Sequence, residues 1–538
     1  MPLPPGLSYF EPPSPWTNIH ENFVHQFKPE ASFLVRHTGT QGREAYLRAT
    51  NNLGWIIDHA IEAKIQMRAI GSGWSFSKVA VCNGGMVQTK SLDLIFNPKR
   101  SYLADEYINA GKTEASLKFV ECGAQVARLN KVLEIDSVAP RCLRASGGSN
   151  GQSIAGATST GTHGAALFTG SVHDSIVGLH IVTGLGRHVW IERASYPVAG
   201  DGLLSWLEAD LISNDSIFNA AVVSFGAFGF IHGVMIETDP LYLLKEYRIK
   251  NVLYTDALME AFAALDITAL CSHLPDMPES GPNHDLYHME IDFNPYTVRK
   301  GGQEGMYVFL FYKVPVPAGY QVRHSGPHAP APSPEFMWMM KGLSNRLGGT
   351  FGYDIIRTMT TRQFEQNIRQ ATEQPTTIGT IFRDTRFTGN IASFAFAVPT
   401  EQIGNTIEHI LAVIANKAFA GAVAVRFVKG TLATLGFTRF ANTSVIELDG
   451  LDIPNNRAVF LAVIERLENH NIPCTIHWGK LNDPLTAERV KRMYGETKLN
   501  DWKRAREGVL PTMVQRAVFN NDFMTQCGLD SPSPILPV

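Results

Sequence analysis

The sequence is poor in cysteine, and neither sign of charge is in large excess. Six cysteines are scattered over 538 residues without a CxxC pair or a metal-like spacing. This spacing favours buried, reduced thiols over a disulfide framework. The formal net charge is −3 at pH 7, so no general attraction to nucleic acid or an anionic membrane is indicated. Small, specific ligands are the better expectation.

Long hydrophobic runs are also scarce. Residues 217–236 hold no Asp, Glu, Lys or Arg, but they include polar residues and three glycines. This pattern predicts a short helix, a tight glycine turn and a buried strand rather than a membrane span. The proline-rich opening MPLPPGLSYFEPPSPW lacks the basic start and apolar core of a signal peptide. We therefore expect a cytoplasmic protein with no membrane partner.

The hydrophobic fraction of 44% and the charged fraction of 18% are those of an ordinary soluble protein. At roughly 100–200 residues per domain, the length indicates two or more domains. Strands and helices alternate up to about residue 240, where a mixed region of strands and amphipathic helices begins. The last part of the chain turns charged and helical. Strands are predicted at 288–293, 306–314, 393–398, 423–428, 444–449 and 474–479.

The most unusual stretch is the glycine-rich loop, residues 145–164, which reads ASGGSNGQSIAGATSTGTHG. No Asp, Glu, Lys or Arg occurs between Arg144 and Asp174. A solvated linker usually carries charge or proline, and a core strand carries more large aliphatic residues. Backbone N–H groups and hydroxyls in such a loop can bind a pyrophosphate without lysine.

A second glycine turn, GSGWSFS, follows a predicted strand at residues 71–77. It lacks the third glycine and the fresh amphipathic helix of the Rossmann dinucleotide fingerprint. Glycine lets the backbone approach phosphate oxygens that a Cβ would keep away. Together the two glycine turns indicate a nucleotide site. The sequence has no P-loop and no GxSxG nucleophile elbow.

The combination of GSGWSFS, GQSIAGATSTGTHG, FGAFGFI and the later HWGK resembles the vanillyl-alcohol-oxidase-type FAD-linked oxidases, in the aldonolactone oxidoreductase and alditol oxidase branch. The resemblance implies an α+β fold with a two-part FAD-binding domain and a mixed α/β cap domain that contains an antiparallel sheet. It implies an N-terminal FAD-binding part at 1–240, a substrate-binding cap at 241–482 and a C-terminal segment, 483–538, that returns to the FAD domain.

The resemblance also implies which residues hold FAD. The pyrophosphate would lie against the first glycine turn and the glycine-rich loop, and the adenine near the FGAFGFI segment. The implied residues are Gly71, Ser72, Gly73, Trp74, Ser75, Ser149, Ser153, Gly156, Ala157, Thr160, Gly161, His163, Gly229 and Ile231. Many relatives carry a histidine, tethered covalently to the flavin, where this chain has Trp74. We therefore expect FAD to be bound without a covalent link at this position.

The substrate site is expected around HWGK, which supplies His477, Trp478 and Lys480. If residues 474–480 are extended, Trp478 and Lys480 share one face and His477 points to the other. A fixed cation at Lys480 would stabilise the negative charge that develops on the flavin. Arg426, in VAVRFVKG, corresponds to the family's active-site arginine.

One position departs from the family. Relatives usually carry a glutamate two residues before the arginine, where this chain has Ala424. The strand SVIELDG offers Glu447 and Asp449 on one face instead. Our hypothesis is that Glu447 replaces the missing carboxylate and orients a hydroxyl, pairs with Arg426 or acts as the base. The alternative is an exposed strand with alternating polar residues.

The function implied is oxidation of a C–OH group of a polyol, sugar, aldonolactone or related hydroxylated metabolite. Hydride would pass to flavin N5, and O2 would be the electron acceptor. A dehydrogenase that uses a quinone or protein acceptor, or a flavin-binding protein with decayed catalysis, remains open. No metal site is expected, because His288, His324 and His328 lack metal-ligand spacing. The oligomeric state is left open.

Overall fold

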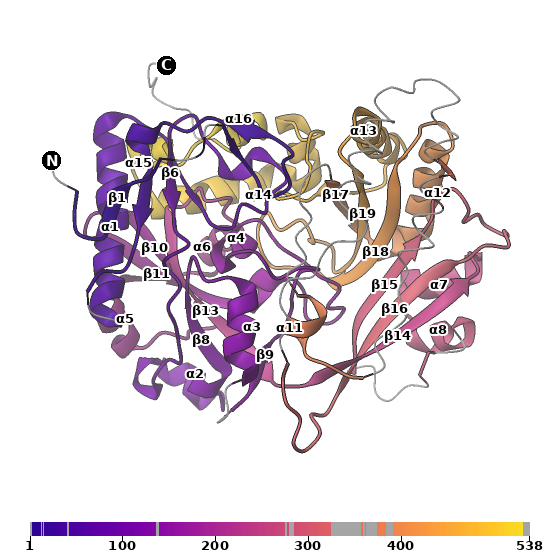
Figure 1. Cartoon of the computed structure of the whole chain (residues 1–538), viewed down its shortest axis with the longest axis horizontal. Helices are drawn as coiled ribbons and strands as arrows, with labels where there is room; N and C mark the ends of the chain where they lie inside the picture. The colour runs from indigo at the N-terminus through magenta and orange to yellow at the C-terminus, as the bar shows by residue number, and fades with distance from the viewer. Residues whose placement is uncertain are drawn as a thin grey trace.

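The computed structural model describes residues 3–530 except 12, 14, 40–41, 136–138, 275–276, 279–284, 324–356, 359–360, 362–373 and 384–390. Two seven-stranded sheets occupy the two halves of the molecule (Figure 1). A four-stranded and a two-stranded sheet complete the strands that are described. Helices pack against these sheets, so the predicted α+β class is confirmed.

The N-terminal half contains the four-stranded sheet, in the order β1-β4-β6-β5, and the first seven-stranded sheet, in which β12-β11-β10-β13-β8-β7 are neighbours and β9 pairs with β13. Helix α1 (Arg43–Ala63) buries one apolar face, and α3 (Val126–Ile135) follows β8. The strands are β1 (Leu7–Tyr9), β4 (Phe33–Val35), β5 (Met67–Ile70), β6 (Gly85–Gln88), β7 (Ile95–Phe96), β8 (Leu117–Glu121), β9 (Arg141–Leu143), β10 (Ile176–Gly184), β11 (Arg187–Glu192), β12 (Asp210–Ser213) and β13 (Phe230–Pro240).

The uncharged stretch 217–236 has the predicted form. Helix α6 (Asp215–Ala221) is followed by a turn in which Phe225 and Gly226 have φ values of 55° and 71°. The chain then enters β13, whose residues are mostly buried. Within the described residues, no helix combines the length and the apolar character needed to cross a bilayer.

The second seven-stranded sheet is antiparallel throughout, in the order β14-β16-β15-β18-β19-β17-β20. Its strands are β14 (Leu243–Val252), β15 (Leu286–Phe293), β16 (Met306–Val314), β17 (Ile391–Pro399), β18 (Gly421–Lys429), β19 (Asn442–Leu451) and β20 (Thr475–Ile476). The predicted strands are confirmed, except that β20 ends at Ile476 instead of Gly479. Sheet membership changes between Pro240 and Leu243, where the sequence placed the end of the first domain; the domain limits themselves stay a prediction.

One face of this antiparallel sheet is apolar and covered by helices. The covering helices include α7 (Asp256–Ala264), α12 (Ile403–Ile414) and α13 (Pro454–Asn469) (Figure 1). Phe427 of β18 stacks on Phe262 of α7 at 5.4 Å between ring centroids, and Phe394 of β17 on Phe460 of α13 at 4.7 Å. Because strand side chains alternate, the residues between these apolar positions lie on the opposite face of the sheet.

The C-terminal helices return to the N-terminal half, where the yellow ribbon lies among the indigo and violet elements (Figure 1). They are α14 (Ala487–Val509), α15 (Met513–Val518) and α16 (Asp522–Gln526). Arg506 of α14 is 1% exposed and donates to the carbonyl of Ala227. Asn521, which caps α16, donates to the carbonyls of Val79 and Val81. The last helices are thus part of the N-terminal core.

Candidate functional site

Strand register places a polar surface on the open face of the antiparallel sheet. Glu290 of β15 lies opposite Arg426 of β18, and Ala424 of β18 lies opposite Glu447 of β19. Directly opposed side chains of antiparallel strands have Cβ atoms ~5 Å apart. Glu447 therefore stands beside Ala424, the position at which the resemblance implies a glutamate. The open face includes Glu290, Asp292, Ser393, Ala422, Ala424, Arg426, Glu447 and Asp449.

Glu447 lies at the centre of this surface. Its carboxylate is 2.8 Å from Nη1 of Arg426 and 3.2 Å from Nζ of Lys480. Arg426 also donates from Nε to Glu290 Oε1 at 2.9 Å. Glu447 is only 1% exposed, so the alternative of an exposed strand is wrong at this position. The structure thus brings together three residues that the sequence proposed: Arg426, Glu447 and Lys480.

The charges in this cluster stabilise one another. Burial alone would raise the pKa of Glu447, but the positive charges of Arg426 and Lys480 hold that pKa well below its usual range. In the same way, Arg426 and a hydrogen bond with His288 outweigh burial and lower the pKa of Glu290 to about 2. Both carboxylates are therefore ionised at neutral pH. A carboxylate with so low a pKa is a weak general base, which favours an orienting role for Glu447.

Two other carboxyl groups on the same face have raised pKa values, whereas those of Glu290 and Glu447 are lowered. The pKa of Asp449 is raised by the protein atoms that surround it and by the neighbouring charge of Glu447, although its side chain is in contact with solvent. A side chain in the wall of a concave surface typically has both many protein neighbours and solvent contact. Burial and the charge of Glu290 raise the pKa of Asp292 well above its usual range. The Oδ1 atom of Asp292 is buried and has no hydrogen-bond partner in the described part of the chain.

Residues 474–480 are not fully extended, which corrects the expected orientation of HWGK. Beyond Ile476 the chain turns. Trp478 enters the core, is 0% exposed and donates its indole N–H to the carbonyl of Leu435 at 2.7 Å. Lys480 instead lies beside Glu447. Trp478 and Lys480 therefore do not share a face, because a turn replaces the strand alternation that the prediction assumed.

Two buried histidines lie next to Glu447. His163 Nε2 is 3.7 Å from Glu447 Oε1, and the His163 and His477 ring centroids are 5.4 Å apart. Burial lowers the pKa of His163 to about 4 and holds that of His477 well below its usual range, so both rings are neutral at pH 7. The Gly479 N–H donates to His477 Nδ1 at 2.9 Å. His163 Nδ1 lies 3.1 Å from the Gly164 carbonyl, which assigns the ring proton to Nδ1 and leaves Nε2 as an acceptor.

The two glycine turns found in the sequence are in direct contact. A Cβ on Gly71 would lie 2.0 Å from Ser153 Oγ, so only glycine fits there. The first turn also binds the HWGK turn: Phe76 N–H donates to the Gly479 carbonyl, and Ser77 Oγ donates to the Trp478 carbonyl, both at 2.8 Å. Both glycine turns therefore adjoin the charged cluster.

The glycine-rich loop fits a phosphate-bearing cofactor such as FAD. The hydroxyls of Ser146 and Ser149 are buried and have no hydrogen-bond partner among the described residues. Ser72 Oγ lies 3.4 Å from Gln125 Nε2, which also holds the carbonyl of Gly151. Hydroxyls that lack partners in a close-packed, uncharged loop are suited to phosphate oxygens.

Other residues of the expected cofactor set lie around this loop. Trp74 packs edge-on against His20 at 5.3 Å between ring centroids. Gly229 has a φ of 116°, and a Cβ there would lie 2.6 Å from the Val182 carbonyl. Ile231 belongs to β13, which packs against helix α4 (Ile154–Ser159) of the glycine-rich loop. The cofactor-binding roles of Gly73, Ser75, Gly156, Ala157, Thr160 and Gly161 stay predictions.

Sequence reasoning missed Glu290 and Asp292. The signal was present in HMEIDF, in which His288, Glu290 and Asp292 alternate with Met289, Ile291 and Phe293. His288 Nε2 lies 2.9 Å from Glu290 Oε2, next to the Arg426 pair. Alternation fixed which face these residues share, but only the register of β15 with β18 shows that this face is the one that carries Arg426.

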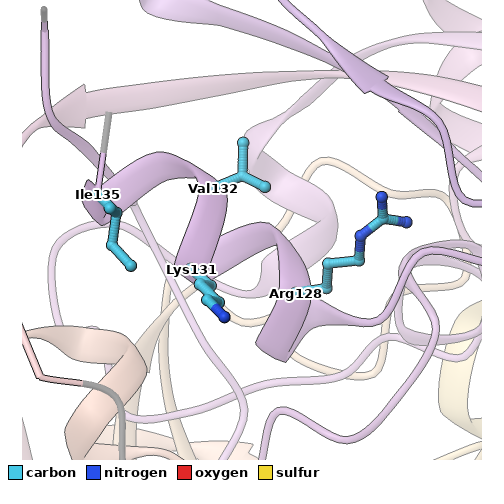
Figure 2. Close-up of a pocket in the computed structure, with 4 residues that line it drawn as sticks. All are labelled: Arg128, Lys131, Val132 and Ile135. Atoms are coloured by element: carbon cyan, nitrogen blue, oxygen red, sulfur yellow. The ribbon is translucent and has the colours of Figure 1, made fainter. Parts of the chain in front are cut away.

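A pocket of about 590 Å³ lies elsewhere, on helix α3 (Figure 2). It is lined by Arg128, Lys131, Val132 and Ile135. None of these residues is a candidate site residue. Within the described residues, no group of three His, Cys, Asp or Glu could hold a metal ion. His324 and His328 lie outside the described residues.

Comparison with curated proteins shows distant homology to aldonolactone oxidoreductases. The chain is 29% identical over 216 residues to D-arabinono-1,4-lactone oxidase of Candida glabrata, which is 39% of this chain and 35% of that protein. It is 29% identical over 205 residues to L-gulono-1,4-lactone dehydrogenase of Mycobacterium tuberculosis, which is 38% of this chain and 39% of that protein. The matches thus span well under half of these relatives. No family model matches the chain.

Comparison with solved structures identifies the fold. Cholesterol oxidase from Brevibacterium sterolicum superimposes with a TM-score of 0.63 at 15% identity, covering 95% of this chain and 96% of that one. Xylooligosaccharide oxidase from Myceliophthora thermophila C1 gives a TM-score of 0.56 at 11% identity, covering 96% and 94%. The fold is that of vanillyl-alcohol-oxidase-type FAD oxidases, and the resemblance proposed from the sequence is confirmed.

Proposed function

We propose that this chain is an FAD-dependent oxidoreductase that oxidises a C–OH group of a polyol, sugar, aldonolactone or related metabolite. The observation that carries the proposal is the meeting of the glycine-rich loop with the charged cluster. A Cβ on Gly148 would lie 3.2 Å from Arg426 Nη1, and His163 lies 3.7 Å from Glu447. A cofactor held by this loop would therefore adjoin Arg426, Glu447 and Lys480.

FAD would be held by the two glycine turns, through backbone N–H groups and the hydroxyls of Ser72 and Ser149. When bound, FAD supplies the acceptor for a hydride from the substrate carbon. Lys480 provides a fixed positive charge, which stabilises negative charge that develops nearby. We also propose that the flavin is not covalently linked, because Trp74 has no nucleophilic ring nitrogen to offer in place of histidine.

The residues around Glu447 can orient a hydroxyl and take its proton. Arg426 and Glu447 provide a donor and an acceptor that are already fixed by ion pairing. His163 Nε2 is an unprotonated acceptor, and Glu447 stands where it would stabilise the imidazolium that forms. Burial lowers the pKa of His163 to about 4, which is still above that of Glu447, so we propose that His163 rather than Glu447 takes the proton and that Glu447 orients the hydroxyl.

The test is anaerobic flavin reduction. The protein is loaded with FAD and mixed with D-arabinono-1,4-lactone, L-gulono-1,4-lactone and a series of polyols, while the visible flavin absorbance is followed. Bleaching by at least one of them supports the proposal. Failure to bind FAD overturns it. A His163→Gln variant that reduces flavin at the wild-type rate would remove His163 as the proton acceptor.

O2 is the proposed electron acceptor, and a quinone or protein acceptor is the second candidate. One of the relatives, from Mycobacterium tuberculosis, is named L-gulono-1,4-lactone dehydrogenase. That name supports the second candidate. Peroxide release during turnover separates the two, because a dehydrogenase would turn over only when an artificial acceptor is added. Cys82, Cys122, Cys142, Cys474 and Cys527 are buried free thiols, which supports a reducing compartment and hence the proposed cytoplasmic location.

A further inference from the structure

The open face of the antiparallel sheet carries more carboxyl groups than cations. Four carboxyl groups and two cations from the described residues meet there: Glu290, Asp292, Glu447, Asp449, Arg426 and Lys480. On β14, which is separated from β15 by β16, Glu246 and Arg248 pair with each other at 2.5 Å and leave the balance unchanged. The site has two more carboxyl groups than cations, and a neutral or anionic substrate would not need these two extra carboxyl groups.

The two cations are already used by two of the carboxyls. Arg426 lies within 2.9 Å of both Glu290 and Glu447, and Lys480 lies 3.2 Å from Glu447. Asp292 Oδ1 is buried without a hydrogen-bond partner within the described chain. The hydroxyl of Ser393 is the group that hydrogen-bonds Asp449. Among the described residues no cation forms an ion pair with Asp292 or Asp449; the charge of Arg426 acts on both from farther away, and that of Lys480 acts on Asp449.

Register shows what lies between these two aspartates. Asp292 is opposite Ala424, and Asp449 is opposite Ala422, on the two sides of β18. Neighbouring strands are ~4.8 Å apart and each residue rises ~3.4 Å, so with two strand spacings and a two-residue offset roughly 12 Å separates the two aspartate backbones. The methyl groups of Ala422 and Ala424 form the floor between them, and both alanines are partly exposed. A small group can rest on this floor between two carboxylates.

We propose that the substrate carries a positively charged amine, which rests over Ala422 and Ala424 between Asp292 and Asp449. This inference depends on the proposed oxidation, because the hydroxyl-bearing carbon would then reach Arg426, Glu447 and Lys480 at the same face. The substrate class is an amino alcohol or amino polyol. The competing possibility is that both carboxyls stay protonated and donate hydrogen bonds to a neutral polyol.

Three isosteric probes separate these possibilities. 1-Amino-1-deoxy-D-glucitol, D-glucitol and D-gluconate share one hydroxylated chain and differ in charge at one end. Titration calorimetry at pH 7 and low salt is expected to give a dissociation constant about tenfold lower for the amine than for D-glucitol, since a charge-assisted hydrogen bond contributes about that factor. D-gluconate should bind more weakly than D-glucitol. Equal or tighter binding of D-glucitol overturns the inference.

Linked protons provide a second readout. Binding of a cation favours the ionised carboxylates, so the amine should release protons, and its binding heat should change between phosphate and Tris buffers. D-glucitol should show no such change. A buffer-independent heat for the amine would contradict the proposal.

Substitution of the two aspartates tests whether they cause the preference for the amine. Asp292→Asn and Asp449→Asn should each reduce the preference for the amine over D-glucitol severalfold. Asp210→Asn, on the exposed edge strand β12, is the matched control and should keep the preference. Calorimetry requires neither turnover nor flavin. Failure to load FAD would therefore defeat the proposed oxidation, whereas a lack of charge preference would defeat only this inference.

Discussion

Glu290 allows a quantitative test of the charged cluster. Its pKa is lowered from 4.5 to about 2, because Arg426 and His288 outweigh the effect of burial. At 1.36 kcal/mol per pKa unit, this difference corresponds to about 3 kcal/mol of folding free energy. The folded-state pKa is the lower one, so this stabilisation is fully present above about pH 4.5 and is lost as the pH falls toward 2. Glu290→Gln should therefore cost about 3 kcal/mol at neutral pH.

The assay is urea unfolding of wild type and variant at a series of pH values from 7 down to 3, followed by tryptophan fluorescence. The difference in unfolding free energy should be constant between pH 7 and about 5 and should shrink below that. Glu465→Gln, at an exposed position on α13, should change stability by less than about 0.5 kcal/mol at every pH. A loss below about 1 kcal/mol for Glu290→Gln, or a loss that does not depend on pH, would refute the reasoning.

Three further predictions concern the cofactor and the chemistry. Lys480→Met should slow anaerobic flavin reduction by about 10²-fold or more, because it removes a fixed charge; stopped-flow absorbance measures this, and Lys480→Arg should recover part of the rate. Gly71→Ala should weaken FAD binding at least tenfold, because the added Cβ would lie 2.0 Å from Ser153 Oγ, and fluorescence titration of the apoprotein measures it. Gly404→Ala in α12, where a Cβ would meet Met259 at an ordinary 3.5 Å, should bind FAD normally. Acid precipitation should release the yellow colour into the supernatant, and colour that stays in the pellet would contradict a non-covalent link at Trp74.

The sequence was sufficient for features that depend on neighbours along the chain. Alternation placed Glu447 and Asp449 on one strand face. The change from helix to glycine turn to strand at 217–236 was also predictable, since each part has its own periodicity.

What the sequence could not supply was pairing across strands. The role of Glu290 depends on the register of β15 with β18, which joins residues 136 positions apart. Nothing local indicates that register. Trp478 shows the other limit: its periodicity predicted a strand face shared with Lys480, but a turn and the hydrogen bond to Leu435 place it in the core.

The contacts between the first glycine turn and HWGK also determine when, during synthesis, this part of the structure can form. Ser77 and Trp478 are 401 positions apart in the chain, and Asn521 is 442 positions from Val79. At 5–20 residues per second, synthesis separates Ser77 from Trp478 by roughly 20–80 s. During that interval the first glycine turn has emerged from the ribosome without the segments that cover it. The candidate site can therefore be complete only after the C-terminal segments have been made, so on the proposed function FAD would bind after translation.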